Sequence, residues 1–110
     1  MIIEKTDIAI ICKNEEKSIE LFFKDFSENY SKFAKDNIII QFSDSKGEET
    51  ENILLFLQYS KEHQINGMSF VIVFNGINID NIPEDIVVVP TLTEAKDIIE
   101  MENIERDLGF

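Results

Sequence analysis

The chain has 110 residues, 44% of them hydrophobic and 29% charged, and its 10 basic and 22 acidic residues give a formal net charge of −12. This length and composition are those of one soluble globular domain. The acidic balance argues against direct binding of nucleic acid or of an anionic membrane, since both depend on Lys and Arg. It favours a protein partner with a basic or mixed surface.

Segments that would carry the protein out of the cytoplasm are not expected. The sequence begins Met1-Ile2-Ile3-Glu4, without the basic stretch or cleavage site of a signal peptide. Its apolar runs, such as residues 53–57, are far shorter than the roughly 20 residues of a membrane span. Cys12 is the one cysteine, which excludes an internal disulfide and fits a reducing compartment. We therefore expect a cytoplasmic protein.

The first third of the chain predicts a β-hairpin followed by a helix. Residues 2–5 and 8–12 are rich in β-branched side chains, and Thr6-Asp7 between them is a suitable turn. Asn14 is a good N-cap residue, and acidic residues follow it, where a helix dipole favours them. Apolar side chains then recur at helical spacing at Ile19, Phe22, Phe23, Phe26, Tyr30 and Phe33.

Two strands and a second helix are expected next. Residues 37–42 form a short apolar run that is typical of a central strand buried on both faces. Residues 43–47 predict a loop, and a helix follows over residues 50–63, with Asn66-Gly67 as its exit. Residues 69–74 predict another buried strand.

The last third predicts a strand and a long helix. Residues 86–89 are of strand type and are ended by Pro90, after which Thr91 and Glu94 have the spacing of a capping box. The second half of the helix is acidic, against its dipole, but also carries an apolar edge. The acids are Glu100, Glu102, Glu105 and Asp107, and the edge is Ile104, Leu108 and Phe110. We expect a C-terminal helical tail, residues 103–110, that packs on its own domain or on a partner.

The order of these elements predicts one α/β domain over residues 1–110. Strands that alternate with helices indicate a largely parallel sheet, and the opening hairpin adds an antiparallel pair. We therefore expect a mixed sheet of about five strands, an N-terminal hairpin plus parallel strands, with three helices.

Catalytic chemistry is not expected from the residue types present. His63 is the one histidine, and it lies in a polar helix end, where a surface position is expected. Cys12 is far from His63 in the predicted fold, and a free cysteine is usually a small buried hydrophobe. The sequence has no His-x-His or Cys-x-x-Cys pair and no Gly-rich phosphate loop. We therefore expect no metal, no cofactor and no enzymatic activity.

Residues 43–52 are the segment that most resembles a site. They join the carboxyl end of a central strand to a helix, at the edge where open α/β sheets bind ligands. Hydroxyl groups in this segment could accept a phosphoryl group, although an ordinary acidic helix start is the alternative. The expected partner-binding residues are Ser43, Asp44, Ser45, Glu49, Thr50, Glu51 and Asn52.

The order of the elements resembles the STAS domain, the fold of bacterial anti-sigma-factor antagonists. The resemblance covers about the whole chain, including the final strand that runs into Thr91-Leu92-Thr93-Glu94-Ala95. It implies a non-enzymatic regulatory module whose partner is an anti-sigma-type kinase or another regulator. In that family a kinase phosphorylates a serine in an Asp-Ser-Ser-Gly-like motif, which corresponds here to Glu49-Thr50-Glu51-Asn52. The resemblance therefore implies Thr50 as the phosphoryl acceptor.

The end of the chain is also similar to short bacterial proteins labelled ribonuclease Z. The similarity runs from Val89-Pro90-Thr91 to Leu108-Gly109-Phe110. That enzyme has a His-x-His-x-Asp-His zinc motif, which this sequence lacks. The alternative function is therefore a ribonuclease Z-type tRNA-processing protein or an accessory subunit of that nuclease.

Overall fold

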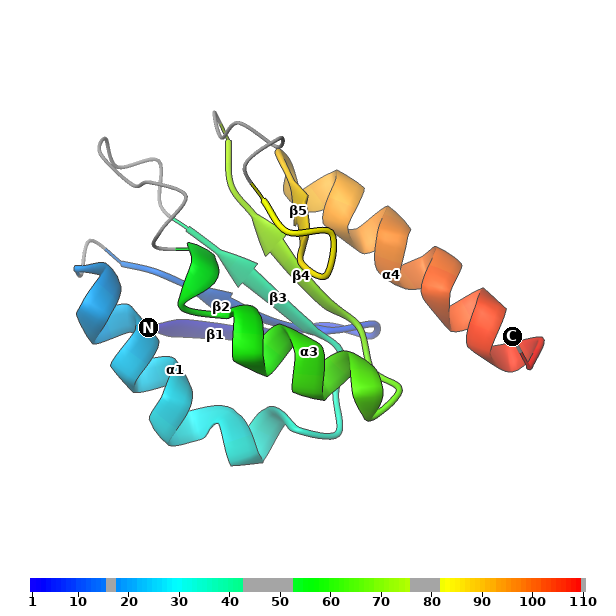
Figure 1. Cartoon of the computed structure of the whole chain (residues 1–110), viewed down its shortest axis with the longest axis horizontal. Helices are drawn as coiled ribbons and strands as arrows, with labels where there is room; N and C mark the ends of the chain where they lie inside the picture. The colour runs from blue at the N-terminus through cyan, green and yellow to red at the C-terminus, as the bar shows by residue number, and fades with distance from the viewer. Residues whose placement is uncertain (16–17, 43–52, 76–81, 110) are drawn as a thin grey trace.

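The computed structural model of the chain describes residues 1–15, 18–42, 53–75 and 82–109. Figure 1 shows these residues as one sheet with helices on its faces. The elements are β1 (Ile2–Lys5), β2 (Ile10–Lys13), α1 (Ile19–Phe33), β3 (Ile38–Gln41), α3 (Leu57–Ile65), β4 (Phe70–Val73), β5 (Val87–Val89) and α4 (Leu92–Asp107).

The strands of the sheet lie side by side in the order in which they occur along the chain. β1 pairs with β2 in antiparallel fashion, and β2 through β5 are parallel to one another. The predicted α/β fold is therefore confirmed for the described residues: a five-stranded mixed sheet, begun by a hairpin, and three helices.

Two cores lie on opposite faces of the sheet, because alternate strand residues point to opposite sides. Ile38 and Ile40 of β3 belong to the core beneath α1 and α3, whereas Ile39 belongs to the core that contains Ala95 and Ile99 of α4. In Figure 1, α1 and α3 lie in front of the sheet. The first core is rich in aromatic rings that pack edge to face or tilted; its buried rings are Phe22, Phe26, Phe33, Phe42, Phe56 and Phe70.

The start of α1 differs from the prediction. Asn14 does not cap the helix; its backbone N–H donates to the Gln41 carbonyl at 3.0 Å and so continues the pairing of β2 with β3. The cap is Ser18, whose hydroxyl accepts from the Leu21 N–H at 3.3 Å. Both residue types are good caps, and the strand register decided between them.

The second predicted helix is helical at residues 53–54 but is interrupted by a turn before α3. α3 begins at Leu57, after a turn at residues 55–56, and the predicted start at residue 50 lies outside the described residues. Its end agrees with the prediction, since Asn66 is the C-cap and Gly67 has a φ of 84°. Glycine adopts this left-handed conformation without the steric cost that a Cβ imposes.

The last helix, α4, is continuous from Leu92 to Asp107. The Thr91 hydroxyl accepts from the Glu94 N–H at 3.2 Å, which confirms Thr91 as the N-cap of α4. Residues 103–107 continue α4, so the expected tail is the end of this helix, and Phe110 lies outside the described residues. Over the described ranges, no helix combines the length and apolar character needed to cross a membrane.

Candidate functional site

The predicted partner-binding segment, residues 43–52, lies outside the described residues, and with it Thr50. The structure describes the residues on both sides of it. Phe42 follows β3 and is 6% exposed, and Ile53 is fully buried in the same core. The Phe42 N–H donates to the Val73 carbonyl at 3.3 Å, which fixes the chain at the carboxyl end of the parallel strands. The segment is thus attached at both ends to the edge where α/β sheets bind ligands.

Gln41 places an acceptor at this same edge. It is the last residue of β3, and its side-chain Oε1 is buried with no hydrogen-bond partner among the described residues. A buried oxygen without a donor costs about 1–3 kcal/mol. Gln41 Oε1 is therefore available to a donor from outside the described part of the chain.

His63 is not the surface residue that its polar neighbours predict. It is fully buried in α3, where its Nε2 donates to the Asp36 carbonyl at 2.6 Å and its Nδ1 accepts from the Tyr30 hydroxyl at 2.8 Å. This assignment gives each ring nitrogen one partner and requires a neutral ring. Burial lowers the pKa of His63 and raises the pKa of Tyr30, so both groups keep the protonation that these hydrogen bonds need.

Cys12 is buried, in agreement with the prediction. It lies in β2, within the core beneath α1 and α3. Burial raises the pKa of its thiol to about 12. Because the thiolate is the nucleophilic form of cysteine, a thiol with this pKa is unreactive near neutral pH.

A polar cluster at the opposite, amino-end edge of the parallel strands holds α4 against the sheet, and we call it the α4 anchor. It joins Asn37 before β3 and Ser69 before β4 to the second half of α4. Arg106 donates to the Ser69 hydroxyl at 3.2 Å and to Asn37 Oδ1 at 3.3 Å, and it also bonds Asn103. Ser69 donates in turn to Glu102. The members of the α4 anchor are Asn37, Ser69, Glu102, Asn103 and Arg106.

Asn37 also ties the strands to each other at this edge. Its side-chain amide donates to the Ile8 carbonyl at 2.9 Å, and its Oδ1 accepts from the Ser69 N–H at 2.8 Å. It is 7% exposed and Ser69 is 1% exposed. Nothing in the sequence near Asn37 predicted this role, because its partners come from distant parts of the chain.

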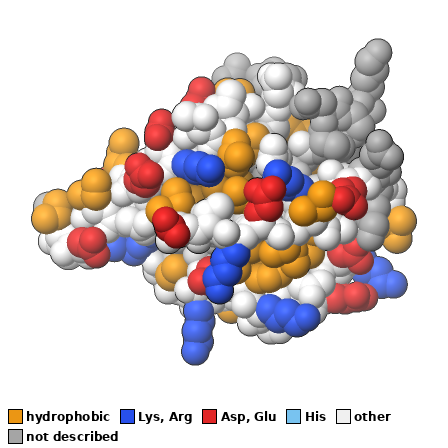
Figure 2. All heavy atoms as spheres, turned by 180° about the vertical axis from the view of Figure 1, so that it is seen from behind, with side chains coloured by type: hydrophobic (Ala, Val, Ile, Leu, Met, Phe, Trp, Pro, Cys, Tyr) orange, Lys and Arg blue, Asp and Glu red, His pale blue; other side chains and the backbone are white. Residues whose placement is uncertain are grey.

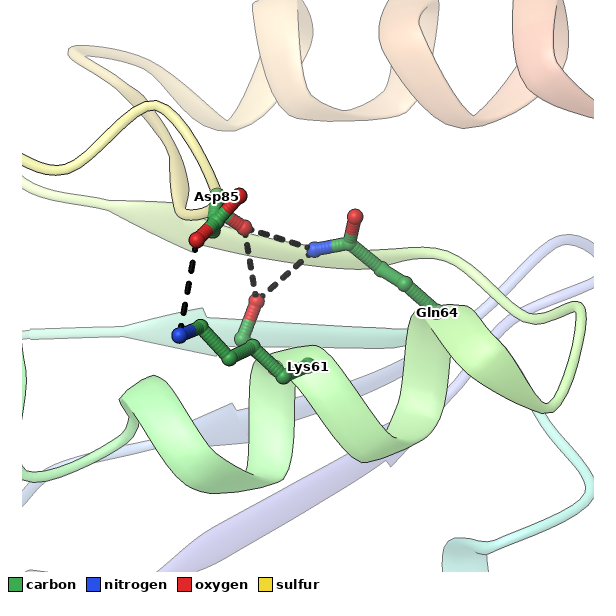
Figure 3. A network of polar contacts seen from close by, with 4 residues as sticks. Lys61, Gln64 and Asp85 are labelled. Atoms are coloured by element: carbon green, nitrogen blue, oxygen red, sulfur yellow. Dashed lines mark hydrogen bonds and ion pairs between the residues drawn. The ribbon is translucent and has the colours of Figure 1, made fainter.

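A second polar contact ties α3 to the segment before β5 (Figure 3). Gln64 donates to the Asp85 carbonyl at 2.9 Å, and Lys61 pairs with the Asp85 carboxylate at 3.4 Å. Lys61 and the Asp85 side chain are more than half exposed, so water screens this ion pair and it contributes little to stability.

Within residues 1–15, 18–42, 53–75 and 82–109, no three His, Cys, Asp or Glu side chains gather as metal ligands do. Comparison of the chain with protein-family models, with curated proteins and with solved structures found no match.

Proposed function

We propose that this chain is a non-enzymatic regulatory module of STAS-like type that binds another protein through residues 43–52. The candidate contact residues are those predicted from the sequence: Ser43, Asp44, Ser45, Glu49, Thr50, Glu51 and Asn52. The proposed partner is a kinase of the anti-sigma type or another regulator with a basic or mixed surface.

The observation that carries this proposal is the state of the single cysteine and the single histidine. Cys12 is a buried thiol whose pKa is raised to about 12, and both ring nitrogens of His63 are used by structural partners. Neither side chain is available to a substrate in this arrangement. A function through surface contacts is therefore better supported than one that uses these groups in chemistry.

The position of residues 43–52 in the chain supports their role as the contact. They leave the carboxyl end of β3, the middle strand of the sheet, after Phe42 and return to the core at Ile53. Both flanking residues are buried, so a partner bound to this segment would be coupled to the packed core. Gln41 Oε1 adds a buried acceptor at the same edge.

Thr50 is the proposed switch. A phosphoryl group adds about −1.5 to −2 charges at neutral pH. The added charge would stand beside Glu49 and Glu51 in a chain whose net charge is already −12. Like-charge repulsion from these two acids, and the cost of removing water from the phosphoryl group in a packed interface, would therefore weaken the contact with the partner.

The test is to isolate the partner from the native cell with the purified chain as bait, and then to titrate that partner against variants. We expect Thr50→Glu to bind at least about tenfold more weakly, equivalent to about 1.4 kcal/mol. The melting temperature should change little, since most surface substitutions change stability by less than about 0.5 kcal/mol. Isothermal titration and thermal unfolding measure the two quantities.

Thr93→Glu is the matched control. Thr93 is an exposed threonine in the first turn of α4, so this variant adds the same charge on a different element. It should bind the partner as the wild type does. Equal affinity of the wild type and Thr50→Glu would remove Thr50 from the mechanism.

The alternative proposal is a ribonuclease Z-type protein or an accessory subunit of that nuclease, and it rests on the similarity of residues 89–110. Metal analysis of the purified chain and incubation with a precursor tRNA test it. Stoichiometric zinc together with specific cleavage would replace the proposal of a binding module.

A further inference from the structure

α4 has two apolar faces, and only one of them is covered by its own domain. Ala95 and Ile99 are fully buried against the sheet. Met101, Ile104 and Leu108 are 61%, 60% and 66% exposed, and we call them the α4 stripe. At 3.6 residues per turn, their spacing of three and four puts them on one side of the helix, opposite Ile99.

The figures show where the α4 stripe lies. In Figure 1 the second half of α4 extends beyond the sheet toward the C-terminus. Figure 2, seen from behind, shows hydrophobic side chains reaching the left-hand tip, where this end of α4 lies, with acidic side chains beside them. A surface helix usually has one apolar stripe, which faces its core. A second stripe that faces solvent is typical of an interaction site.

The α4 anchor fixes which face points outward. Asn103 and Arg106 lie on the side of α4 that contacts Asn37 and Ser69. These hydrogen bonds prevent α4 from rotating about its own axis, so the α4 stripe stays on the solvent side. The stripe is therefore a preformed surface, and binding to it requires no rearrangement of the helix.

The charges beside the α4 stripe identify the chemistry of its partner. The helical period places Glu100 and Asp107 along one side of the stripe and Glu105 along the other, and all three are exposed. Two copies of the chain joined through this face would bring these acids together, and each copy carries a net charge of −12. An anionic membrane would be repelled in the same way. A partner surface with apolar residues between Lys or Arg side chains is complementary to the α4 stripe and to the acids beside it.

We propose that the α4 stripe docks an amphipathic helix of another protein whose apolar face is flanked by Lys or Arg. The spacing of three and four residues matches the way in which two helices pack. This site is separate from residues 43–52, whose flanking residues Phe42 and Ile53 lie in the core on the other face of the sheet. It does not depend on Thr50.

The test uses a synthetic helical peptide of about 18 residues, a length at which isolated helices form in part. The peptide carries Leu on one face and Lys beside it. A second peptide has the same composition in an order that scatters the Leu residues, and a third has Glu in place of Lys. We expect saturable one-to-one binding of the first peptide to the full chain, and no saturable binding of the other two.

Ile104→Ser should weaken binding of the Leu/Lys peptide by at least about tenfold, because central apolar residues dominate helix docking. Leu21→Ser is the matched control. Leu21 is 54% exposed on α1, so this variant removes a similar surface side chain from another helix and should bind as the wild type does. Circular dichroism and the melting temperature should not distinguish the two variants. Thr50→Glu should also leave peptide binding unchanged, which separates this proposal from the previous one.

Three results would overturn the proposal. The first is equal affinity of the wild type and Ile104→Ser for the Leu/Lys peptide. The second is a concentration-dependent dimer in sedimentation that Ile104→Glu abolishes, because the occupant would then be a second copy. The third is binding to phosphatidylcholine or phosphatidylglycerol vesicles that Ile104→Ser abolishes, because the occupant would then be a lipid surface.

Discussion

His63 shows how a titratable side chain can be a part of the core. Its ring contacts Tyr30 and Phe70 edge to face, and each of its nitrogens has a hydrogen-bond partner. The hydrogen bond to the Asp36 carbonyl joins α3 to the turn that precedes β3. The residue therefore links two elements, and its neutral form is the one that fits.

The pH dependence of stability follows from this environment. Unfolded histidine titrates near 6.5, and burial lowers the pKa of His63 in the folded chain. Below about pH 6.5 the unfolded chain therefore binds a proton that the folded chain does not. The free energy of unfolding should fall as the pH drops through about 6.5, and should continue to fall until the folded pKa is reached. Urea unfolding at a series of pH values measures this.

The single histidine also allows a direct check by NMR, because its ring signals can be assigned without interference from another histidine. The ring protons of the folded chain should titrate below pH 6.5, and those of the urea-unfolded chain near that value. A folded pKa at or above about 6.5 would contradict the assignment of His63 as a buried neutral ring.

At the scale of elements, the α4 anchor explains how an acidic helix end remains folded. Four acidic residues in its second half oppose the helix dipole, yet α4 continues to Asp107. Arg106 compensates by bonding Ser69, Asn37 and Asn103. The end of α4 thus contacts its own domain through polar side chains, while Ile104 and Leu108 of the apolar edge are exposed.

Arg106→Met should release the end of this helix. Hydrogen bonds from a charged donor contribute about 1.5–3 kcal/mol, so we expect a loss of about 2 kcal/mol in the free energy of unfolding. Amide hydrogen exchange over residues 103–107 should become faster than in the wild type. Lys96→Met, which removes the same charge from the first half of α4, is the control. Unchanged exchange in Arg106→Met would show that the α4 anchor does not hold the helix.

The sequence predicted the elements better than their boundaries. Helical spacing and short apolar runs located every described helix and strand, since both report directly on which faces are buried. The two errors in helix boundaries, at the start of α1 and before α3, have local causes. Asn14 and Ser18 are both good caps, and only the pairing of β2 with β3 shows that Asn14 continues the strand. The turn at residues 55–56 interrupts an apolar run that resembles a continuous helix.

The burial of His63 could have been predicted, but the α4 anchor could not. Residues 53, 56, 60 and 63 are all buried, and their spacing of three and four continues one helix face through two polar residues. That period was visible in the sequence, although the polar neighbours obscured it. By contrast, Arg106 and Asn37 are 69 residues apart, and no local pattern indicates that they meet.

At the scale of the whole molecule, the residues that flank the proposed contact segment and the α4 stripe lie on different faces of one sheet. Phe42 and Ile53, on either side of residues 43–52, belong to the core of α1 and α3, and the α4 stripe lies outside the other core. The net charge of −12 favours basic partners at both. Since the same fold can host unrelated functions, the function of this chain follows from which of these surfaces a partner covers.

The hydrogen-exchange footprint of the full chain, free and bound to the partner isolated from the native cell, tests directly whether residues 43–52 form the contact. Peptides that span residues 42–53 should exchange more slowly in the complex, and Thr50→Glu should reduce this protection at equal partner concentration. Protection confined to other parts of the chain, with residues 42–53 unchanged, would contradict the claim that this protein acts through that segment.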